Sequence, residues 1–349
     1  MFGECYRNRR VLLTGHTGFK GSWLALWLQN LGAQVTGLAL DPDTIPNHWD
    51  LLKLDMPDHR VDIRDAAGLS RVVKNAKPEI IFHLAAQALV RRSYRMPQET
   101  WDTNVMGTVN LLEACRDLPD LKAVVVITTD KCYENKESTQ GYKEDDRLGG
   151  HDPYSASKAA AELVVASYRD AIFKGAPLIS TARAGNVIGG GDWCEDRLVP
   201  DLMRAQDKGE TLKVRSPNAL RPWQHVLEPL SGYLQLGQKL LMDKKEFEGA
   251  WNFGPDRKNA LTVSTLLDHM KAKWEAFPDT VSLHETTLLH LDSTKAHQQL
   301  KWNPVLNTDQ QLEMTLDWYR SLRENQSVIS GEQLESYQKS AKTAKAVWA

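Results

Sequence analysis

The chain has 349 residues, 42% of them hydrophobic and 25% charged, which is the composition of a globular protein with a sizeable core. Its formal net charge of −2 gives no electrostatic reason to expect nucleic acid or an anionic membrane as a partner. No apolar run approaches the ~20 residues that span a bilayer, and the polar, basic start of the chain does not resemble a signal peptide. Scattered cysteines predict no metal site, no disulfide framework and a reducing cytoplasm: Cys5, Cys115, Cys132 and Cys194.

The first half of the chain alternates short apolar segments with helical ones. Strands are predicted at Arg10–Thr14, Val35–Leu40, His59–Ile63, Glu79–Leu84, Ala123–Thr129 and Leu178–Ala182. Helices are predicted at Ser22–Leu31, Glu99–Arg116 and Pro153–Phe173. A further helix is predicted after the third strand and ends at about Ala76. Strands rich in Val and Ile suit a sheet buried on both faces, and their alternation with helices implies right-handed crossovers. We therefore predict an α/β fold with a Rossmann-type, doubly wound parallel sheet over residues 1–186.

The rhythm changes after Asn186, where a glycine triplet and a proline interrupt it. The elements predicted beyond it are strands at Leu212–Val214 and Ala250–Phe253, and helices at Val226–Leu241, Thr262–Trp274 and Thr308–Leu322. This pattern predicts a smaller, mixed α/β lobe over residues 187–326 that mainly binds the substrate. The tail of residues 327–349 is polar, and we expect it to be partly disordered.

Seven residues between the first strand and the first helix have the pattern of a phosphate-binding turn: Gly15, His16, Thr17, Gly18, Phe19, Lys20 and Gly21. The glycines are spaced three and three, unlike those of GxGxxG. They still permit a tight turn, admit the backbone to a pyrophosphate and leave the helix N-terminus facing the anion. Lys20 either adds charge near the pyrophosphate or is solvated.

Three other places complete the predicted dinucleotide site. Asp41, at the end of the second strand, can accept hydrogen bonds from both ribose hydroxyls and would repel a 2′-phosphate, which favours NAD over NADP. Asp62 and Ile63 follow the third strand, where the adenine would lie. Small residues leave the fourth strand and let the cofactor pass close: Leu84, Ala85, Ala86 and Gln87.

Tyr154 and Lys158 are four residues apart on a predicted helix, so their side chains share one face. Lowering the pKa of a phenol from ~10 to ~7 takes about 4 kcal/mol of preferential phenolate stabilisation. A nearby ammonium and the positive nicotinamide ring can supply it. Such a tyrosine removes an alcohol proton while hydride leaves the same carbon, which is the chemistry of a dehydrogenase.

Thr129, Asp130 and Lys131 follow the fifth strand and add an acid and an amine at the nicotinamide end of the site. A plain dehydrogenase needs only the phenol and one amine. The additional pair therefore indicates a second reaction, which moves protons on carbon and on a leaving oxygen. A structural salt bridge is the alternative interpretation.

Together these motifs resemble those of the extended short-chain dehydrogenase/reductase superfamily, and within it the nucleotide-sugar 4,6-dehydratases, from about residue 8 to about residue 325. Epimerases of the superfamily usually carry small hydroxyl residues at positions 129–131, and dTDP-glucose dehydratases carry Thr-Asp-Glu. Asp-Lys is found in dehydratases of CDP-glucose and of UDP-N-acetylglucosamine. Two stretches resemble the CDP-glucose enzymes in particular, which implies a step in making 3,6-dideoxyhexoses for bacterial surface polysaccharide: Gly15–Leu24 and Arg221–Val226.

The resemblance implies that NAD takes the C4 hydride of the sugar and returns it to C6, giving a CDP-4-keto-6-deoxyhexose. Tyr154 would deprotonate the C4 hydroxyl while Thr129 hydrogen-bonds that oxygen. Lys131 would take the C5 proton and Asp130 would protonate the departing C6 hydroxyl. These two groups would then need the reverse of their protonation states in water near pH 7. We hypothesise that one proton passes between them when the site closes, because desolvation penalises separated charges.

The resemblance also implies contacts with the substrate and with a second subunit. Asn186 and Asn252 would reach the sugar nucleotide, and arginines offer paired donors to phosphate oxygens. Arg221 is the favoured arginine, whereas an ordinary surface role stays open for Arg197 and Arg215. A homodimer through a four-helix bundle, with a tetramer and a wholly monomeric packing as alternatives, would use apolar side chains of two helices: Val105, Val109, Leu112, Ala160, Leu163 and Val164.

Three rival functions stay open on the sequence. A dehydratase of UDP-N-acetylglucosamine or dTDP-glucose is the nearest, and a nucleotide-sugar 4-epimerase comes next. A non-catalytic dinucleotide-binding scaffold belongs to another class, and such a protein has no reason to keep the phenol, the amines and the acid together.

Overall fold

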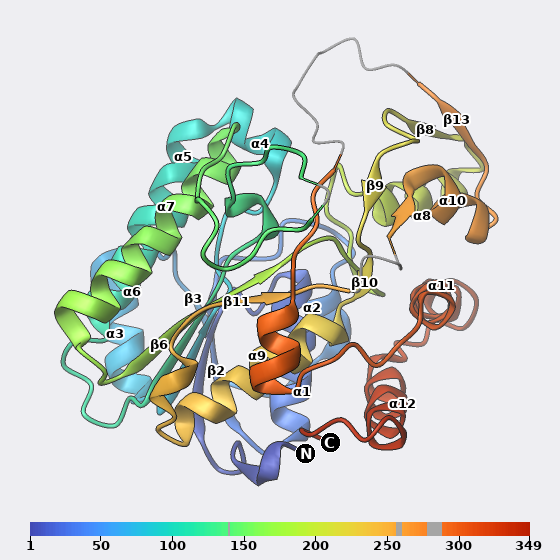
Figure 1. The fold of residues 1–349 in the computed structure, drawn as a ribbon. Coiled ribbons are helices and arrows are strands. Elements are labelled where there is room, and N and C mark those ends of the chain that lie inside the picture. Colours follow the sequence, from blue (N-terminus) through green and yellow to red (C-terminus); the bar gives the residue numbers. More distant parts are fainter. Residues whose placement is uncertain (139, 256–259, 278–287) are drawn as a thin grey trace.

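The computed structural model describes residues 1–138, 140–255, 260–277 and 288–349. Its centre is a seven-stranded sheet in the order β11-β6-β5-β4-β1-β2-β3, with every neighbouring pair parallel (Figure 1). The doubly wound parallel sheet that the sequence predicts is confirmed. Its strands are β1 (Arg10–Thr14), β2 (Gln34–Ala39), β3 (Asp58–Arg60), β4 (Ile80–His83), β5 (Ala123–Ile127), β6 (Leu178–Ala184) and β11 (Gly249–Phe253).

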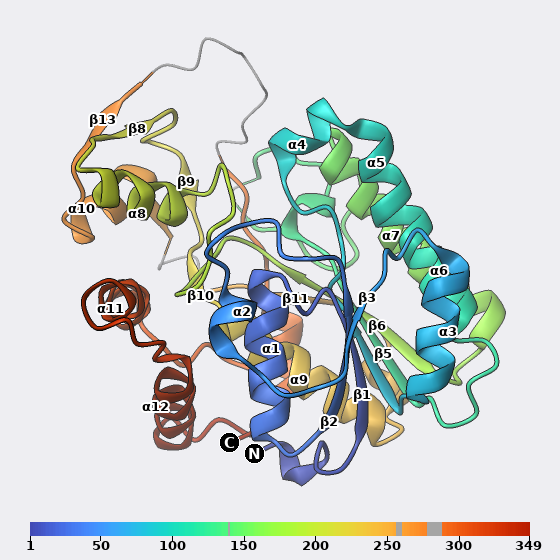
Figure 2. The ribbon, with the colours of Figure 1, turned by 180° about the vertical axis from the view of Figure 1, so that it is seen from behind.

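Helices cover both faces of the sheet (Figures 1 and 2). Every residue of β5 is buried, and alternate residues point to opposite layers because side chains of a strand alternate. Val124 and Val126 pack into one apolar cluster, and Val125 packs into the other with Trp23 and Trp27. The first layer contains α3 (Ala66–Ala76), α6 (Gly107–Ala114) and α7 (Pro153–Ser167), and the second contains α1 (Phe19–Asn30) and α9 (Leu227–Leu241).

Each of the two long predicted helices contains a π-helical segment and is therefore not one continuous α-helix. The predicted Glu99–Arg116 helix is α5 (Pro97–Trp101), the π-helical η2 (Asp102–Met106) and α6 in succession. The helix α7 continues into the π-helical η4 (Tyr168–Phe173). Short elements that the sequence did not predict are η1 (Phe2–Glu4), α2 (His48–Leu52), α4 (Val90–Arg95), η3 (Asp130–Cys132), η5 (Lys245–Phe247) and η7 (Ala296–Leu300). None of the helices in the described ranges has the length and apolar character of a membrane span.

A smaller group of elements lies beyond one end of the sheet, at the upper right of Figure 1. The predicted helix 262–274 ends early, at His269, because Lys271 takes a left-handed φ of 52° and Trp274 pairs with β8 as a strand. The elements of this group are α8 (Leu198–Lys208), β8 (Leu212–Val214), β9 (Leu220–Arg221), β12 (Leu261–Thr262), α10 (Val263–His269) and β13 (Trp274–Ala276). A two-residue pair, β7 (Val187–Ile188) and β10 (Gln224–His225), connects it to the sheet layer.

Two elements predicted for the second lobe belong to the large sheet layer instead. The strand β11 pairs with β6 along its whole length, and α9 packs on the sheet above it. The reason is burial, since Trp251 and Phe253 are fully enclosed beneath α9. The domain limits at 186 and 326 stay predictions, but beyond residue 187 the chain returns to the central sheet with β11 and to its helical cover with α9.

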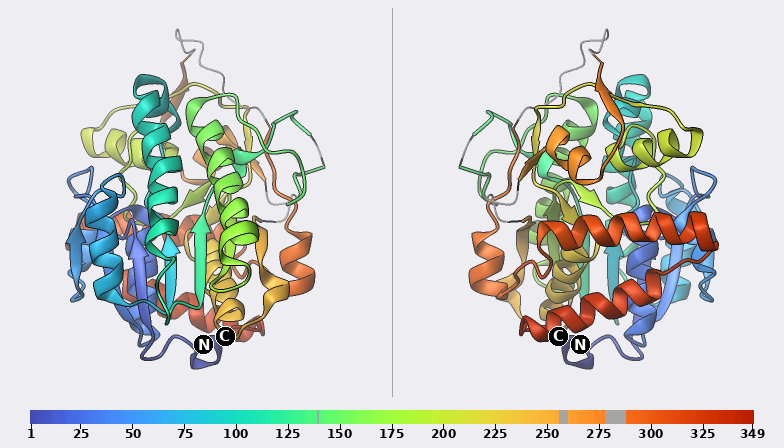
Figure 3. Two further views of the ribbon diagram at one scale, coloured as in Figure 1. Left: turned by 90° about the vertical axis from the view of Figure 1, so that its left-hand side faces the viewer. Right: turned by 90° about the vertical axis from the view of Figure 1, so that its right-hand side faces the viewer.

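The expectation of a partly disordered tail is wrong. The helix α11 (Thr308–Asn325) is followed by α12 (Ser330–Thr343), which crosses the molecule near both chain ends (Figure 3). Leu334, Tyr337 and Ala341 are buried along one face of α12, at the spacing of an amphipathic helix. Trp348 stacks on Phe2 with ring centroids 5.1 Å apart. The polar composition of the tail hides these few anchoring positions.

Glu228, on α9, connects the sheet layer to the C-terminal segments. Its fully buried carboxylate accepts hydrogen bonds from the backbone N–H groups of Val305 at 2.9 Å and Leu306 at 2.7 Å, and from the hydroxyl of Tyr337 at 2.8 Å. Burial raises the pKa of Glu228 to about 7. A single side chain thus joins three parts of the chain.

Candidate active site

A cleft with a volume of about 890 Å3 opens at the carboxyl ends of the strands, where the order reverses between β4 and β1. This is the place where doubly wound sheets bind ligands. Of the site residues predicted from the sequence, only His16 and Asn252 lie outside its lining. Those that line it are Gly15, Thr17, Gly18, Phe19, Lys20, Gly21, Asp41, Asp62, Ile63, Leu84, Ala85, Ala86, Gln87, Thr129, Asp130, Lys131, Tyr154, Lys158, Asn186, Arg197, Arg215 and Arg221.

The glycines of the turn between β1 and α1 are required by close backbone contacts. Gly15 has a left-handed φ of 75°, and a Cβ added to it would lie 2.6 Å from the backbone N of Ala85. A Cβ on Gly21 would lie 2.0 Å from the carbonyl oxygen of Gly15. The helix α1 begins at Phe19, directly after the turn, so the N–H groups of its first turn face the cleft. The residues present therefore fit a pyrophosphate.

His16 supports this turn from beneath and does not line the cleft. Its ring is fully buried, and its Nε2 lies 2.8 Å from Oδ1 of Asp58. A Cβ added to Gly37 would lie 2.7 Å from the ring, so β2 passes directly over it. Burial lowers the pKa of His16, while Asp58 opposes that effect. The His16 side chain therefore supports the turn and does not make the predicted contact with the cofactor, because it points into the protein.

The adenosine end of the predicted site contains Asp41 and Asp62. The Asp41 carboxylate is largely exposed, with Nε of Arg60 3.5 Å from its Oδ1. Asp62 has a different environment, because it accepts hydrogen bonds from the backbone N–H and the guanidinium of Arg64 at 2.8 and 2.6 Å. These bonds lower the pKa of Asp62. Asp41 is therefore the more exposed of the two acids, and its contact with the ribose stays a prediction.

Tyr154 and Lys158 lie in the first turns of α7, whose N-terminus is capped by Asp152. Burial raises the pKa of Tyr154 to about 12, and a hydrogen bond with Thr129 opposes this rise. Burial lowers the pKa of Lys158 to about 8, and its Nζ donates to the carbonyl oxygen of Ile127 at 3.2 Å. Burial thus outweighs the hydrogen bond with Thr129, and the lowering of the phenol pKa by the ammonium and the nicotinamide ring stays a prediction.

Thr129, Asp130 and Lys131 lie beside this phenol. Thr129 donates from Oγ1 to Oδ1 of Asp130 at 3.0 Å, and Nζ of Lys131 is 3.9 Å from the same oxygen. The Asp130 side chain is 3% exposed, against 29% for Lys131. Oδ2 of Asp130 is buried and has no hydrogen-bond partner among the residues that the structure describes. A Cβ on Gly185 would lie 2.9 Å from this oxygen, so glycine leaves the acid room.

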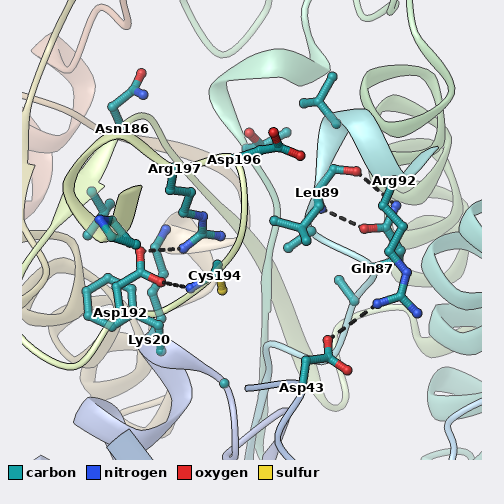
Figure 4. Close-up of a pocket in the computed structure, with 18 of the residues that line it drawn as sticks. Lys20, Asp43, Gln87, Leu89, Arg92, Asn186, Asp192, Cys194, Asp196 and Arg197 are labelled. Carbon is teal, nitrogen blue, oxygen red and sulfur yellow. Dashed lines mark hydrogen bonds and ion pairs between the residues drawn. The ribbon is translucent and has the colours of Figure 1, made fainter. Parts of the chain in front are cut away.

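The facing wall of the cleft carries charged side chains that form ion pairs (Figure 4). Nη1 of Arg197 is 2.9 Å from Oδ2 of the buried Asp192. Arg91 and Arg215 approach the same oxygen of Asp196, each at 3.7 Å. Three of these residues were not predicted from the sequence, because no local motif marks them: Arg91, Asp192 and Asp196.

Lys20 extends from α1 into the cleft and is not a solvated surface residue. Its Nζ lies 3.5 Å from the hydroxyl of Tyr233. Burial lowers the pKa of Lys20 to about 7, and the nearby Arg197 adds to this effect. The first of the two alternatives, a charge close to the bound ligand, therefore fits the structure better.

Asn252 differs from the prediction that it binds substrate. It lies on β11 and is fully buried, and its Nδ2 donates to the carbonyl oxygens of Tyr142 at 2.8 Å and Asp292 at 3.1 Å. Its Oδ1 accepts a hydrogen bond from the hydroxyl of Tyr133 at 2.7 Å. The structure gives this amide a structural role, because β11 directs it at neighbouring loops.

The parallel sheet, the glycine turn at its switch point and the Tyr154/Lys158 pair on the helix after β5 define a dinucleotide-binding protein of the dehydrogenase/reductase type. A family model described as GDP-mannose 4,6 dehydratase matches residues 12–315. The chain belongs to this family.

Individual relatives agree with this assignment. The chain is 45% identical over 334 residues to the CDP-glucose 4,6-dehydratase of Salmonella typhimurium. The aligned region covers 90% of this chain and 92% of the relative. The structure matches that of a dTDP-glucose 4,6-dehydratase from Streptomyces venezuelae with NAD bound, with a TM-score of 0.77 and 25% identity over 90% of this chain and 97% of the other. The UDP-glucose 4-epimerase of Thermus thermophilus in complex with NAD shares the fold, with a TM-score of 0.77 and 24% identity over 89% and 98% of the two chains. The predicted resemblance to nucleotide-sugar 4,6-dehydratases is confirmed.

Proposed function

We propose that this chain is an NAD-dependent 4,6-dehydratase that converts CDP-glucose to CDP-4-keto-6-deoxyglucose. The observation that carries the proposal is the 45% identity to a CDP-glucose enzyme along 90% of the chain. The cleft supports it chemically, since a phenol, an acid and an amine line one wall: Tyr154, Asp130 and Lys131. A plain epimerase or a non-catalytic scaffold has no use for the acid.

NAD fits the first part of the cleft. At Gly15 and Gly21 the neighbouring backbone lies too close for any Cβ, so only glycine permits this tight turn, whose backbone N–H groups suit a pyrophosphate. Asp41 offers a carboxylate for the ribose. When bound, NAD supplies a reversible hydride acceptor, which takes the C4 hydride of the sugar and gives it back at C6.

Tyr154 is the base that we propose for the C4 hydroxyl. Its phenol is buried and hydrogen-bonded with Thr129, so both oxygens can meet the hydroxyl of the sugar. A positive charge near the phenol is needed to lower its pKa, and we propose that the Lys158 ammonium, whose Nζ donates to the carbonyl of Ile127, and the nicotinamide ring supply it. Lys158 holds the phenol side of α7 against β5.

Asp130 and Lys131 are the acid and the base that we propose for the loss of water. The 4-ketone acidifies C5–H; Lys131 accepts this proton while the C6–O bond breaks, and Asp130 protonates the leaving oxygen. The buried Oδ2 of Asp130, without a partner among the described residues, is an oxygen that a sugar hydroxyl can satisfy. The proton on Lys131 returns to C5 once hydride has reached C6, and the proton that Tyr154 took from the C4 hydroxyl replaces the one that Asp130 gave to the leaving oxygen. The net change is then loss of one water.

Two experiments test the proposal. Enzyme incubated with CDP-, UDP- and dTDP-hexoses should form a 4-ketone from CDP-glucose and react far more slowly with the others. Deuterium placed at C4 should then appear in the new methyl group, because NAD carries it within the site. Faster reaction with a UDP- or dTDP-hexose would show that CDP-glucose is not the substrate. Loss of the deuterium to water would refute the internal hydride transfer.

The Asp130→Asn variant separates the two halves of the reaction. It should still oxidise C4 but stall, with reduced nicotinamide visible by absorbance, because removing a general acid typically costs roughly 10²–10⁴-fold. Full turnover by this variant would contradict the acid role.

We also propose a homodimer through α5, η2 and α7. Large apolar side chains are exposed on adjacent helices there: Trp101 by 40%, Met106 by 49% and Leu163 by 62%. These helices lie side by side on the outside of the sheet (Figure 3). Partly buried members of the predicted set are Val105, Val109, Ala160 and Val164. Leu112 is the exception, because it is fully buried in the core of its own subunit.

We place the enzyme in the cytoplasm and in the supply of 3,6-dideoxyhexoses for surface polysaccharide. Four free cysteines suit a reducing compartment. Deleting the gene should remove the dideoxyhexose from the surface polysaccharide of its host, and an unchanged sugar composition would contradict this role.

A further inference from the structure

A buried ion pair lies directly behind the catalytic loop, residues 129–131. Glu162 is on α7, one helical turn after Lys158, and Arg183 is on β6. Arg183 donates through Nε and Nη2 to the two carboxylate oxygens of Glu162, each at 2.9 Å. Their side chains are 4% and 3% exposed. The pair is bidentate and almost completely removed from water.

The pair is bonded to the residue that precedes the catalytic loop. Thr128 donates from its hydroxyl to Oε1 of Glu162, and Thr181 on β6 donates to Oε2 at 2.7 Å. Both carboxylate oxygens therefore have two donors. The side chain of Thr128 is held in place where β5 ends and the loop begins.

The same pair is bonded to the segment that follows the loop. Nη1 of Arg183 donates to the hydroxyl of Tyr133 at 2.7 Å, and the guanidinium lies 4.9 Å from the centre of the Tyr133 ring. The Tyr133 hydroxyl donates onward to Oδ1 of Asn252 at 2.7 Å. Asn252, which the sequence assigned to the substrate, is thus the outer anchor of this network.

We propose that Glu162 and Arg183 are positioning residues that fix both ends of the catalytic loop, an inference that rests on the proposed function. We call Thr128, Tyr133, Glu162, Thr181 and Arg183 the clamp. A buried ion pair contributes little net stability, because desolvation offsets its attraction, so its use here fits a demand for geometry. Displacement of a catalytic group by about 1 Å can cost roughly 10²-fold in rate.

The clamp should matter more for the loss of water than for the oxidation at C4. Tyr154 is held by α7, a helix of 15 residues with its own cap at Asp152. Asp130 and Lys131 belong to η3, a single turn of three residues. Loosening the Tyr133 end therefore moves the acid and the amine and leaves the phenol in place.

The test compares Tyr133→Phe with Tyr6→Phe. Tyr6 is an equally buried tyrosine whose hydroxyl donates to the carbonyl of Leu234 in α9 and has no bond to the clamp within the part of the chain that the structure describes. After mixing with CDP-glucose, Tyr133→Phe should form reduced nicotinamide at nearly the wild-type rate and form product at least about tenfold more slowly, so that reduced nicotinamide accumulates. Tyr6→Phe should show no accumulation at a similar Tm.

A second pair of variants examines the other end of the clamp. Thr128→Val keeps the shape of the side chain but removes the hydroxyl, and it should accumulate reduced nicotinamide as well. Thr128→Ser restores a donor to Glu162 and should rescue product formation. Equal slowing of both half-reactions, or accumulation in Tyr6→Phe, would overturn the inference.

Amide hydrogen exchange tests the clamp without any turnover. Exchange at residues 129–132 should rise in Tyr133→Phe while exchange in α7 stays unchanged. If wild-type enzyme formed no ketone from CDP-glucose, the proposed function would fail, whereas the exchange result would still decide the clamp. Unchanged exchange across the catalytic loop would refute it.

Discussion

Replacing Glu228 by Gln should change how the stability of this protein depends on pH. The carboxylate is fully buried at the junction of α9, α12 and the segment around Leu306, and it accepts three hydrogen bonds there. Burial raises its pKa to about 7 from the ordinary 4.5. The folded protein therefore binds a proton more tightly than the unfolded chain does.

The size and sign of the effect follow from linkage. At 1.36 kcal/mol per pH unit, the difference between about 7 and 4.5 corresponds to about 3 kcal/mol. This stabilisation is fully present below pH 4.5 and is lost as the pH rises to about 7. Gln keeps the shape of the side chain and stays neutral, so the constant part of the substitution cancels between two pH values.

The assay is urea unfolding of wild type and Glu228→Gln at about pH 5 and about pH 8, at one protein concentration. The stability of wild type relative to the variant should fall by about 2–3 kcal/mol between these values. Glu79 provides a control of opposite sign. Burial raises its pKa, but the hydrogen bonds from Arg9 and Arg10 outweigh burial, so the pKa is lowered overall. Wild type should therefore lose stability relative to Glu79→Gln as the pH falls below 4.5, which is measured in a further titration at about pH 3. The same pH dependence in wild type and Glu228→Gln would refute the reasoning.

Three further substitutions test the turn, the dimer and the C-terminal anchor. Gly21→Ala puts a Cβ 2.0 Å from the Gly15 carbonyl oxygen, so NAD affinity, measured by fluorescence titration, should fall at least about tenfold; unchanged affinity would contradict the close fit. Leu163→Asp charges a side chain that is 62% exposed on the proposed interface, so sedimentation should show a folded monomer, and a persisting dimer would contradict that interface. Trp348→Ala removes a buried ring stacked on Phe2 and should cost roughly 3–5 kcal/mol in urea unfolding, whereas a loss below about 1 kcal/mol would show that the tail is dispensable.

The sequence was most informative where local chemistry determines structure. An apolar run located β1 with its observed limits, because a buried strand leaves an unbroken signal, and the alternating Leu212–Val214 located β8. The start of α1 was placed at Ser22, three residues late, because Gly21 breaks the helical pattern although it lies inside the helix. The helix α12 was missed since only a few of its side chains are apolar.

The site divides in the same way. The glycine turn and the Tyr154/Lys158 spacing are local motifs, and the structure brings them into one cleft. The clamp pair of Glu162 and Arg183 becomes visible only when β6 lies beside α7, because nothing in either segment marks its partner. Asn252 was assigned to the substrate by position in the family pattern, and only the pairing of β11 with β6 shows where its side chain points.

The placement of β11 bears on recombination between relatives. A strand from the second half of the chain, β11, forms one edge of the central sheet, next to β6. A chimera with one crossover near residue 186 would therefore combine sheet strands from two parents. A graft of the smaller group of elements would have to transfer α8–β10 and β12–β13 separately and leave α9 and β11 with their native sheet.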